Sequence, residues 1–151
     1  KWTAFGAEDF SADMGISRTV DATETTSSTA AEPGLAYPRS AVAIAARAAG
    51  VHALDTPYTK FSDLEGLRAE ALLAKSIGYK GKLAIHPAQV EIIESVFMPT
   101  KAEIERARRV LTIAAEAEAE GRGSISLDGE MIDMPVILRA RNVLQDAGIS
   151  E

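Results

Sequence analysis

Two adjacent carboxylates, Glu8 and Asp9, are the first residues in the chain that could do chemistry. They follow residues 3–7, an apolar stretch that predicts a strand, buried from its first residue and ending in a glycine turn. In proteins that alternate strands and helices, side chains just past the carboxyl end of a strand lie where ligands bind. Mg²⁺ prefers carboxylate oxygens, so Asp9 is a candidate metal ligand. A solvated turn is the alternative, because one carboxylate does not make a metal site.

Two further polar residues follow predicted strands. Asp55 closes the segment 51–55, where it either caps the turn that follows or hydrogen-bonds a substrate. His86 follows the segment 81–85 and precedes Pro87 at the start of a predicted helix. It is either a structural histidine or a contact for an anionic group. Both residues are therefore candidate substrate ligands at the same end of the protein as Asp9.

A fourth candidate, Asp133, lies near the end of the chain, directly before Met134-Pro135 and a predicted helix. Its position predicts a helix N-cap, and nothing near it in the sequence marks it as an acid or a base. Basic residues that could supply positive charge near a site are also present: Arg18, Arg39, Lys80 and Lys82.

The segments that must position the first three candidates alternate between strands and helices. Strands are predicted at 3–7, 51–55 and 81–85, and a polar loop at 13–34. Helices are predicted from a Ser40 cap to Gly50, from a Ser62–Glu65 capping box to Gly78, and from Pro87 to about Phe97. This alternation predicts parallel strands in an α/β fold. Since three strands cannot close a barrel, residues 1–97 are either a small open sheet or the last βα units of an eight-stranded β/α (TIM) barrel.

Residues 98–151 have a different pattern and predict a helical extension. A capping box at Thr100–Glu103 begins one helix, in which Glu105 and Arg109 are spaced to form an ion pair. Asp128-Gly129 predicts a hairpin within residues 124–132, and a last helix is predicted from Met134 to Asp146. This extension has no parallel strand of its own, so it is expected to pack on a neighbour or cover a site.

Composition narrows the class of protein. The chain has 151 residues, a formal net charge of −6 and no cysteine. Nucleic-acid binding, disulfides, thiolate catalysis and cysteine-ligated zinc are therefore not expected, nor is a membrane span. A cytoplasmic location is expected. The chain begins inside a predicted strand and without methionine, so we expect it to be a fragment of a longer protein.

Four motifs in sequence order resemble the carboxyl-terminal half of the citrate lyase beta-subunit family, in the HpcH/HpaI aldolase superfamily, which includes malyl-CoA and citramalyl-CoA lyases. Phe5 to Phe10, with Asp13 and Gly15, resembles the metal-binding stretch of that family. Its seventh strand is resembled by Ala48 to Gly50 with Ala53 to Tyr58. Its eighth strand is resembled by Gly81 to Gln89, and its lid by Leu127 to Pro135.

The resemblance implies the carboxyl-terminal portion of a β/α barrel (1–97) with a helical lid (98–151), a Mg²⁺ cofactor and a CoA-thioester substrate. It implies that Asp9 is a metal ligand, and that Asp133 reaches the active site of an adjacent subunit as an acid/base group in a homo-oligomer, a trimer or a hexamer. The implied reaction is carbon–carbon cleavage that yields acetyl-CoA or a 2-oxo acid. The other metal-binding Glu and the substrate-binding Arg of the family belong to earlier strands that this chain does not include. Cleavage of the thioester, or a non-catalytic role as an assembly partner, are the alternatives.

Overall fold

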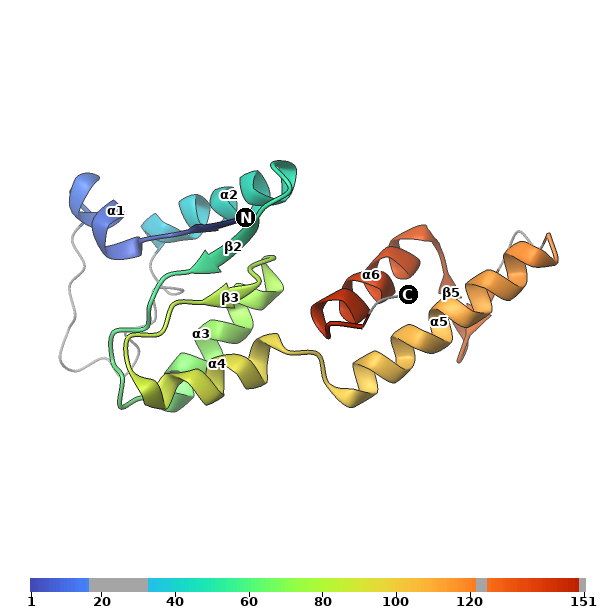
Figure 1. The fold of residues 1–151 in the computed structure, drawn as a ribbon. Helices are drawn as coiled ribbons and strands as arrows, with labels where there is room; N and C mark the ends of the chain where they lie inside the picture. The colour runs from blue at the N-terminus through green and yellow to red at the C-terminus, as the bar shows by residue number, and fades with distance from the viewer. Residues whose placement is uncertain (17–32, 122–124, 150–151) are drawn as a thin grey trace. The chain divides into compact units, whose positions relative to one another are not determined.

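The structure, a computed structural model, describes residues 1–16, 33–121 and 125–149. They form two compact units, Lys1–Phe97 and Met98–Glu151 (Figure 1). The first unit contains a parallel sheet in the order β1 (Trp2–Ala4), β2 (His52–Asp55) and β3 (Gly81–Lys82). Trp2 is paired with His52, and Leu54 with Gly81, so the carboxyl ends of the three strands lie at one edge of the sheet.

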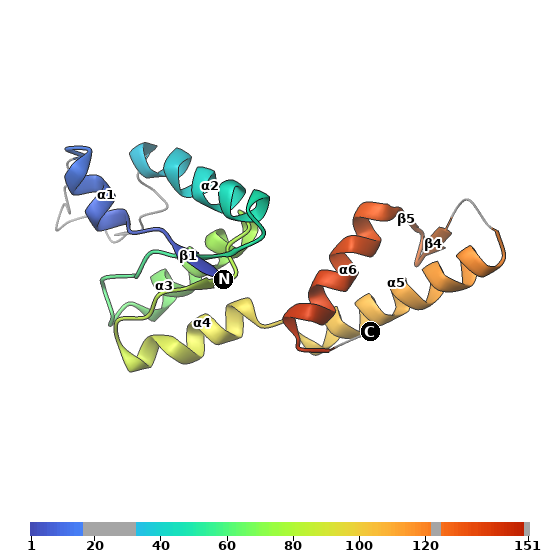
Figure 2. The same cartoon turned by 45° about the horizontal axis from the view of Figure 1, so that its top comes forward.

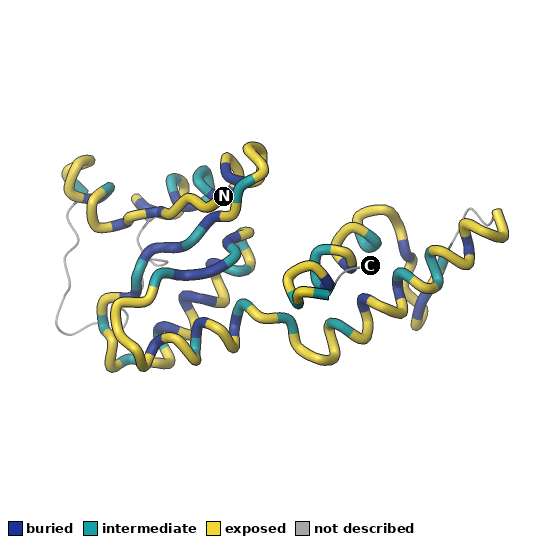
Figure 3. Tube along the Cα trace, in the orientation of Figure 1, coloured by how far each residue is buried: buried dark blue, intermediate teal, exposed yellow. Residues whose placement is uncertain are grey.

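Helices cover both faces of this sheet. Figures 1 and 2 show α2 (Pro33–Ala48) on one face, and α3 (Leu64–Ser76) with α4 (Val90–Phe97) on the other. A short helix α1 (Ala7–Asp13) follows β1, and a 3₁₀ turn η2 (Pro87–Gln89) precedes α4. Small residues allow α2 and α3 to approach the sheet closely, as in the core formed by Phe5, Ala7, Leu35, Ala43, Ala46, Ala53, Ala74 and Tyr79. Figure 3 shows the burial of β2 and β3 between the helices.

The first strand differs from the prediction. Residues Trp2–Ala4 are all exposed, because β1 is an edge strand of the described sheet and pairs only with β2. The prediction that this strand is buried from its first residue is therefore wrong. The strand also ends before Ala7, which is buried but begins α1, although Phe5 still donates from its N–H to the Leu54 carbonyl at 3.0 Å. The third strand is shorter than 81–85 as well, since only Gly81 and Lys82 pair with β2.

Two predicted helix starts are wrong. Helix α2 begins at Pro33, and Ser40 lies inside it, where its Oγ donates to the Ala36 carbonyl at 2.9 Å. Helix α3 is capped by Asp63 rather than Ser62, because the Asp63 carboxylate accepts from the Gly66 N–H at 2.9 Å and from the Tyr58 hydroxyl at 2.6 Å. The predicted loop at 13–34 falls mostly on residues 17–32, outside the described part of the chain, as does Arg18.

The second unit is an antiparallel helix pair with a hairpin between the two helices. Helix α5 (Lys101–Ala119) begins with the predicted capping box of Thr100 and Glu103. Strands β4 (Ile125–Leu127) and β5 (Glu130–Ile132) form the predicted hairpin, and both turn residues have the positive φ that a two-residue turn requires. Helix α6 (Met134–Asp146) then packs on α5. Arg109 forms an ion pair with Asp128 of the turn instead of the predicted pair with Glu105.

Candidate active site at the carboxyl edge of the sheet

Asp9 lies in the first turn of α1, just past the carboxyl end of β1, and it is exposed. Gly6 is the N-cap residue of this helix, with an extended backbone and no side-chain cap. A Cβ added to Gly6 would lie 3.2 Å from Asp9 Oδ2, so glycine at this position leaves room for the carboxylate. The helix N-terminus also favours negative charge in its first turn. The local structure thus presents the Asp9 carboxylate to solvent at the carboxyl edge of the sheet.

The donor chemistry of Asp9 fits one ligand of a Mg²⁺ ion, since its oxygens are hard donors and open to solvent. Within residues 1–16, 33–121 and 125–149, no group of three or more acidic, histidine or cysteine side chains could hold a metal ion. Among the described residues, Asp9 therefore does not belong to a group of three or more metal-binding side chains.

Asp55 has a different environment, because its carboxylate is completely buried in a cluster of charges. Arg39 of α2 donates to it twice, from Nε to Oδ1 at 2.8 Å and from Nη2 to Oδ2 at 2.6 Å. Lys82 of β3 donates from Nζ to Asp55 Oδ2 at 2.7 Å and to Glu70 Oε1 of α3 at 2.6 Å. We call these four residues the buried charge cluster. It joins two strands to a helix on each face of the sheet, and a substrate contact for Asp55 stays a prediction.

Tyr79 contacts the buried charge cluster through Arg39. The Tyr79 hydroxyl donates to the Arg39 carbonyl at 2.8 Å. Burial, with a smaller contribution from the Asp55 carboxylate, raises the pKa of the Tyr79 hydroxyl, although the Arg39 guanidinium opposes the shift. Among the described residues, Arg39 Nη1 is buried and has no hydrogen-bond partner.

His86 lies in the loop after β3 and is exposed. Its Nδ1 accepts from the Ala88 N–H at 3.1 Å, so the imidazole caps the 3₁₀ turn that begins at Pro87. The ring stacks on Phe61, with centroids 5.1 Å apart and an interplanar angle of 19°. Since Nδ1 accepts this hydrogen bond, Nε2 is the nitrogen that carries the proton in the neutral ring. A contact between His86 and substrate stays a prediction.

Sequence reasoning missed three buried polar residues near this edge. Gln89 accepts from the Ile85 N–H at 2.9 Å and donates from Nε2 to the Tyr58 carbonyl at 2.8 Å, which joins the loops that follow β2 and β3. Thr56 accepts from the Ala7 N–H through Oγ1 at 3.1 Å. Glu70 is part of the buried charge cluster, and its helical spacing from Leu67 and Ala74 could have indicated that it faces the core.

Asp133 belongs to the second unit, where it is exposed and caps α6. Its Oδ1 accepts from the Val136 N–H at 3.1 Å, which confirms the cap that the sequence predicts. The residues on either side include two exposed methionines, Met131 and Met134, which are 74% and 61% exposed. The Asp133 carboxylate is thus presented to solvent beside an apolar surface.

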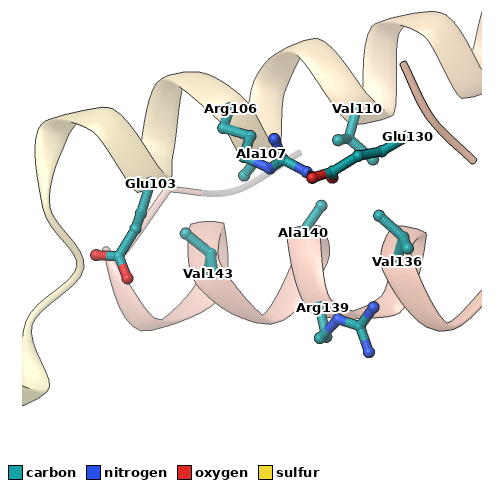
Figure 4. Close-up of a pocket in the computed structure, with 9 residues that line it drawn as sticks. All are labelled: Glu103, Arg106, Ala107, Val110, Glu130, Val136, Arg139, Ala140 and Val143. Atoms are coloured by element: carbon teal, nitrogen blue, oxygen red, sulfur yellow. The ribbon is translucent and has the colours of Figure 1, made fainter. Parts of the chain in front are cut away.

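The groove between α5 and α6 is not a candidate site for an anion (Figure 4). Figure 4 shows Val136, Ala140 and Val143 of α6 pointing toward α5. Two arginines and two glutamates line it as well, and the Arg106 guanidinium is paired with the Glu130 carboxylate. The groove therefore offers an apolar floor without an excess of positive charge.

A parallel sheet covered by helices on both faces, with an exposed aspartate at its carboxyl edge, places the chain in the class of β/α proteins. Residues 1–87 match the family described as HpcH/HpaI aldolase/citrate lyase. The chain belongs to this family, which confirms the resemblance found in the sequence.

Curated relatives match most of this chain but only part of their own length. A citrate lyase subunit beta-like protein of Deinococcus radiodurans is 43% identical over 95% of this chain and 47% of that protein. The citrate lyase subunit beta of Haemophilus influenzae is 40% identical over 98% of this chain and 48% of that protein. A (3S)-malyl-CoA thioesterase of Cereibacter sphaeroides is 44% identical over 69% of this chain and 36% of that protein. The chain thus spans less than half the length of these relatives.

A solved structure supports the same family. The protein CitE of Mycobacterium tuberculosis, in complex with magnesium, acetoacetate and coenzyme A, has a TM-score of 0.70 and is 33% identical. The match covers 96% of this chain and 51% of CitE.

In the part of this chain that the structure describes, no helix combines the length and the apolar composition needed to cross a membrane.

Proposed function

We propose that this chain is the carboxyl-terminal portion of a Mg²⁺-dependent lyase that cleaves a carbon–carbon bond in a CoA ester of the citryl-, malyl- or citramalyl-CoA type. Residues 1–97 would supply the last βα units of a β/α barrel, and residues 98–151 its lid. The observation that carries the proposal is the exposed Asp9 carboxylate at the strand edge of a chain that belongs to the citrate lyase family. The magnesium and coenzyme A bound to CitE agree with this assignment.

In this proposal, Asp9 supplies one oxygen ligand, and the remaining ligands come from earlier strands. Bound Mg²⁺ would polarise the oxygen on the carbon that becomes a carbonyl and would hold the adjacent carboxylate. The Asp133 carboxylate would take the proton of the hydroxyl group as that oxygen becomes a carbonyl and the carbon–carbon bond breaks. The electron pair of the broken bond goes to the thioester enolate, and the Asp133 carboxyl would then return the same proton to the enolate carbon. Only Oδ1 accepts the cap hydrogen bond from Val136, so Oδ2 would be the atom that transfers the proton.

Two substitutions at position 133 separate catalysis from capping in the full-length protein that carries this chain. Asn is as good an N-cap as Asp but cannot transfer a proton, whereas Ala can do neither. We expect both Asp133→Asn and Asp133→Ala to lower kcat by about 10²- to 10⁴-fold, the usual contribution of a general acid or base. Activity retained by Asp133→Asn but lost in Asp133→Ala would assign the residue to helix capping and overturn its catalytic role.

Mixed oligomers test whether Asp133 acts in an adjacent subunit. Asp9→Asn and Asp133→Asn proteins are each expected to be inactive, but a mixed oligomer would contain sites with Asp9 from one subunit and Asp133 from its neighbour. Random mixing of equal amounts should restore about a quarter of the wild-type activity. If Asp133 instead served its own subunit, unfolding and refolding the two variants together would give no activity.

Cleavage of the thioester is the second candidate function, favoured by the identity with the (3S)-malyl-CoA thioesterase. The two reactions leave different products from malyl-CoA. The lyase gives acetyl-CoA and glyoxylate, whereas the thioesterase gives free CoA and malate. A thiol assay run beside a glyoxylate assay distinguishes them: free CoA without glyoxylate would replace the lyase by the thioesterase.

A third possibility is a non-catalytic assembly role for the chain alone. We expect the isolated 151-residue chain to show neither tight Mg²⁺ binding nor turnover, because the described residues contain no group of three or more metal-binding side chains. Calorimetric titration with Mg²⁺ and the product assays above check this. Turnover by the isolated chain would show that its own residues complete the site.

A further inference from the structure

Helix α1, which carries Asp9, has no cap of its own. Its N-cap residue is Gly6, which has no side chain to accept from the amides of the first turn. The Ala7 N–H is instead satisfied by a residue far along the chain, since it donates to Thr56 Oγ1 at 3.1 Å. Ala7 is 0% and Thr56 1% exposed, so this hydrogen bond is shielded from water.

Thr56 is itself held in place by the segments around it. The preceding residue, Asp55, is fixed by the buried charge cluster, with hydrogen bonds to Arg39 and Lys82 of 2.6–2.8 Å. One step earlier, the Leu54 carbonyl accepts from the Phe5 N–H at 3.0 Å. The hydroxyl of Thr56 thus continues the pairing of β1 with β2 by one side-chain hydrogen bond, past the point where the two backbones separate.

We infer that Thr56 is a positioning residue for Asp9, and that its hydroxyl holds the first turn of α1 in the orientation that presents the carboxylate. This inference rests on the proposed function, in which Asp9 is a metal ligand. Ala7 and Asp9 lie in the same helical turn, so a shift of the Ala7 amide moves the Asp9 backbone with it. Without the hydroxyl, a buried N–H would lose its partner, which a protein avoids by moving the group toward water.

The test compares Thr56→Val, which keeps the shape but removes the hydroxyl, with Thr56→Ser, which keeps the hydroxyl. The full-length protein is titrated with Mn²⁺, which takes oxygen ligands as Mg²⁺ does, and the hydrogen exchange of residues 7–13 is followed without metal. We expect Thr56→Val to bind Mn²⁺ roughly tenfold more weakly and to exchange faster in α1, as loss of one buried hydrogen bond predicts. Thr56→Ser should match the wild type in both. In turnover, kcat should fall more than KM changes.

Unchanged Mn²⁺ affinity and unchanged exchange in Thr56→Val would overturn the inference. If the valine variant does not fold, Thr56→Ala replaces it, because alanine removes the hydroxyl without adding a methyl group in its place. Unfolding of both variants would also overturn it, since Thr56 would then stabilise the whole unit. Asp9→Asn, measured in parallel, identifies a failure of the proposed function: wild-type Mn²⁺ affinity in that variant would remove Asp9 from the metal site, whatever Thr56 does to α1.

Discussion

The two units use the same kind of ion pair in opposite environments. In the first unit, Arg39 and Asp55 are 2% and 0% exposed, and Lys82 and Glu70 complete a cluster of two cations and two carboxylates. In the second unit, the Arg109–Asp128 pair links α5 to the hairpin, and its side chains are 51% and 53% exposed. The Arg106–Glu130 pair is similarly exposed.

Because of this difference in exposure, the two kinds of ion pair are expected to contribute differently to stability. Removing one partner of a buried pair leaves an uncompensated charge away from water, whereas water and salt screen an exposed pair. The buried charge cluster therefore fixes the arrangement of β2, β3, α2 and α3, on which the candidate site depends. The exposed pairs of the second unit accompany a helix pair that is held together mainly by its apolar core.

The largest expected effect comes from breaking the buried charge cluster. Lys82→Met should lower the free energy of unfolding of the first unit by about 3 to 5 kcal/mol, because the buried Asp55 and Glu70 carboxylates would both lose the ammonium group that they bind. Urea titration followed by the fluorescence of Trp2, the single tryptophan of the chain, measures this. Arg106→Met, which removes an exposed cation, is the matched control. If Lys82→Met lowered the free energy of unfolding by less than about 1 kcal/mol, the buried charge cluster would not be shielded from water.

A smaller effect is expected at Tyr79, and it depends on pH. Tyr79→Phe removes the hydrogen bond to the Arg39 carbonyl and should cost about 1 kcal/mol at neutral pH. The raised pKa of Tyr79 means that the folded state holds the phenol proton more tightly than the unfolded state. The resulting stability is fully present below about pH 10 and is lost as the pH rises further, toward the folded-state pKa.

The wild type should therefore lose more stability above about pH 10 than Tyr79→Phe does. Urea midpoints at neutral and alkaline pH measure the difference. Tyr37→Phe serves as the control, because Tyr37 is 82% exposed. Equal alkaline losses in the wild type and in Tyr79→Phe would mean that the Tyr79 hydroxyl does not contribute.

The cap of α6 should contribute about as much as one exposed hydrogen bond. Asp133→Ala should lower the stability of the second unit by about 1 kcal/mol, whereas Asp133→Asn should leave it nearly unchanged, since both Asp and Asn accept from the Val136 N–H. Thermal unfolding followed by circular dichroism at 222 nm compares the two. An equal loss in both variants would assign the effect to the charge of Asp133 at the helix N-terminus rather than to its hydrogen bond.

The smallest effect is expected at the exposed pair. Arg109→Ala should change the stability of the second unit by less than about 1 kcal/mol, and the change should shrink as the salt concentration rises, because salt screens exposed charges. Thermal unfolding at low and high NaCl checks this. A larger loss that did not respond to salt would place this pair with the buried charge cluster.

The features that the sequence predicted correctly depend on neighbouring residues. The Asp128-Gly129 turn, the Thr100–Glu103 capping box and the strand that ends at Asp55 are each encoded within a few positions. The start of α3 was wrong by one position because Ser62 and Asp63 are both good cap residues. The choice depends on the Tyr58 hydroxyl, which binds the Asp63 carboxylate from outside the helix.

The candidate site was harder to predict, because its hydrogen bonds join residues that lie far apart in the sequence. The position of Asp9 past a strand could be inferred from residues 3–9, but the hydrogen bond from Ala7 to Thr56 joins residues from two separate strand ends. The sequence marked Arg39 and Lys82 only as basic residues, and their partners Asp55 and Glu70 lie on other elements. Pairings of this kind follow from the tertiary fold, which local patterns do not specify. The site roles of Asp9, Asp55, His86 and Asp133 stay predictions.

The pairing of Trp2 with His52 has a consequence for how the chain acquires its structure. During synthesis, β1 emerges long before β2, so the hydrogen bonds between these two strands form only after β2 has followed. Pairing β1 with β2 closes the long segment between Trp2 and His52. This is slow compared with forming α5, the hairpin and α6, which follow one another directly in the sequence. We therefore expect the second unit to acquire its structure faster than the β1–β2 pair of the first unit.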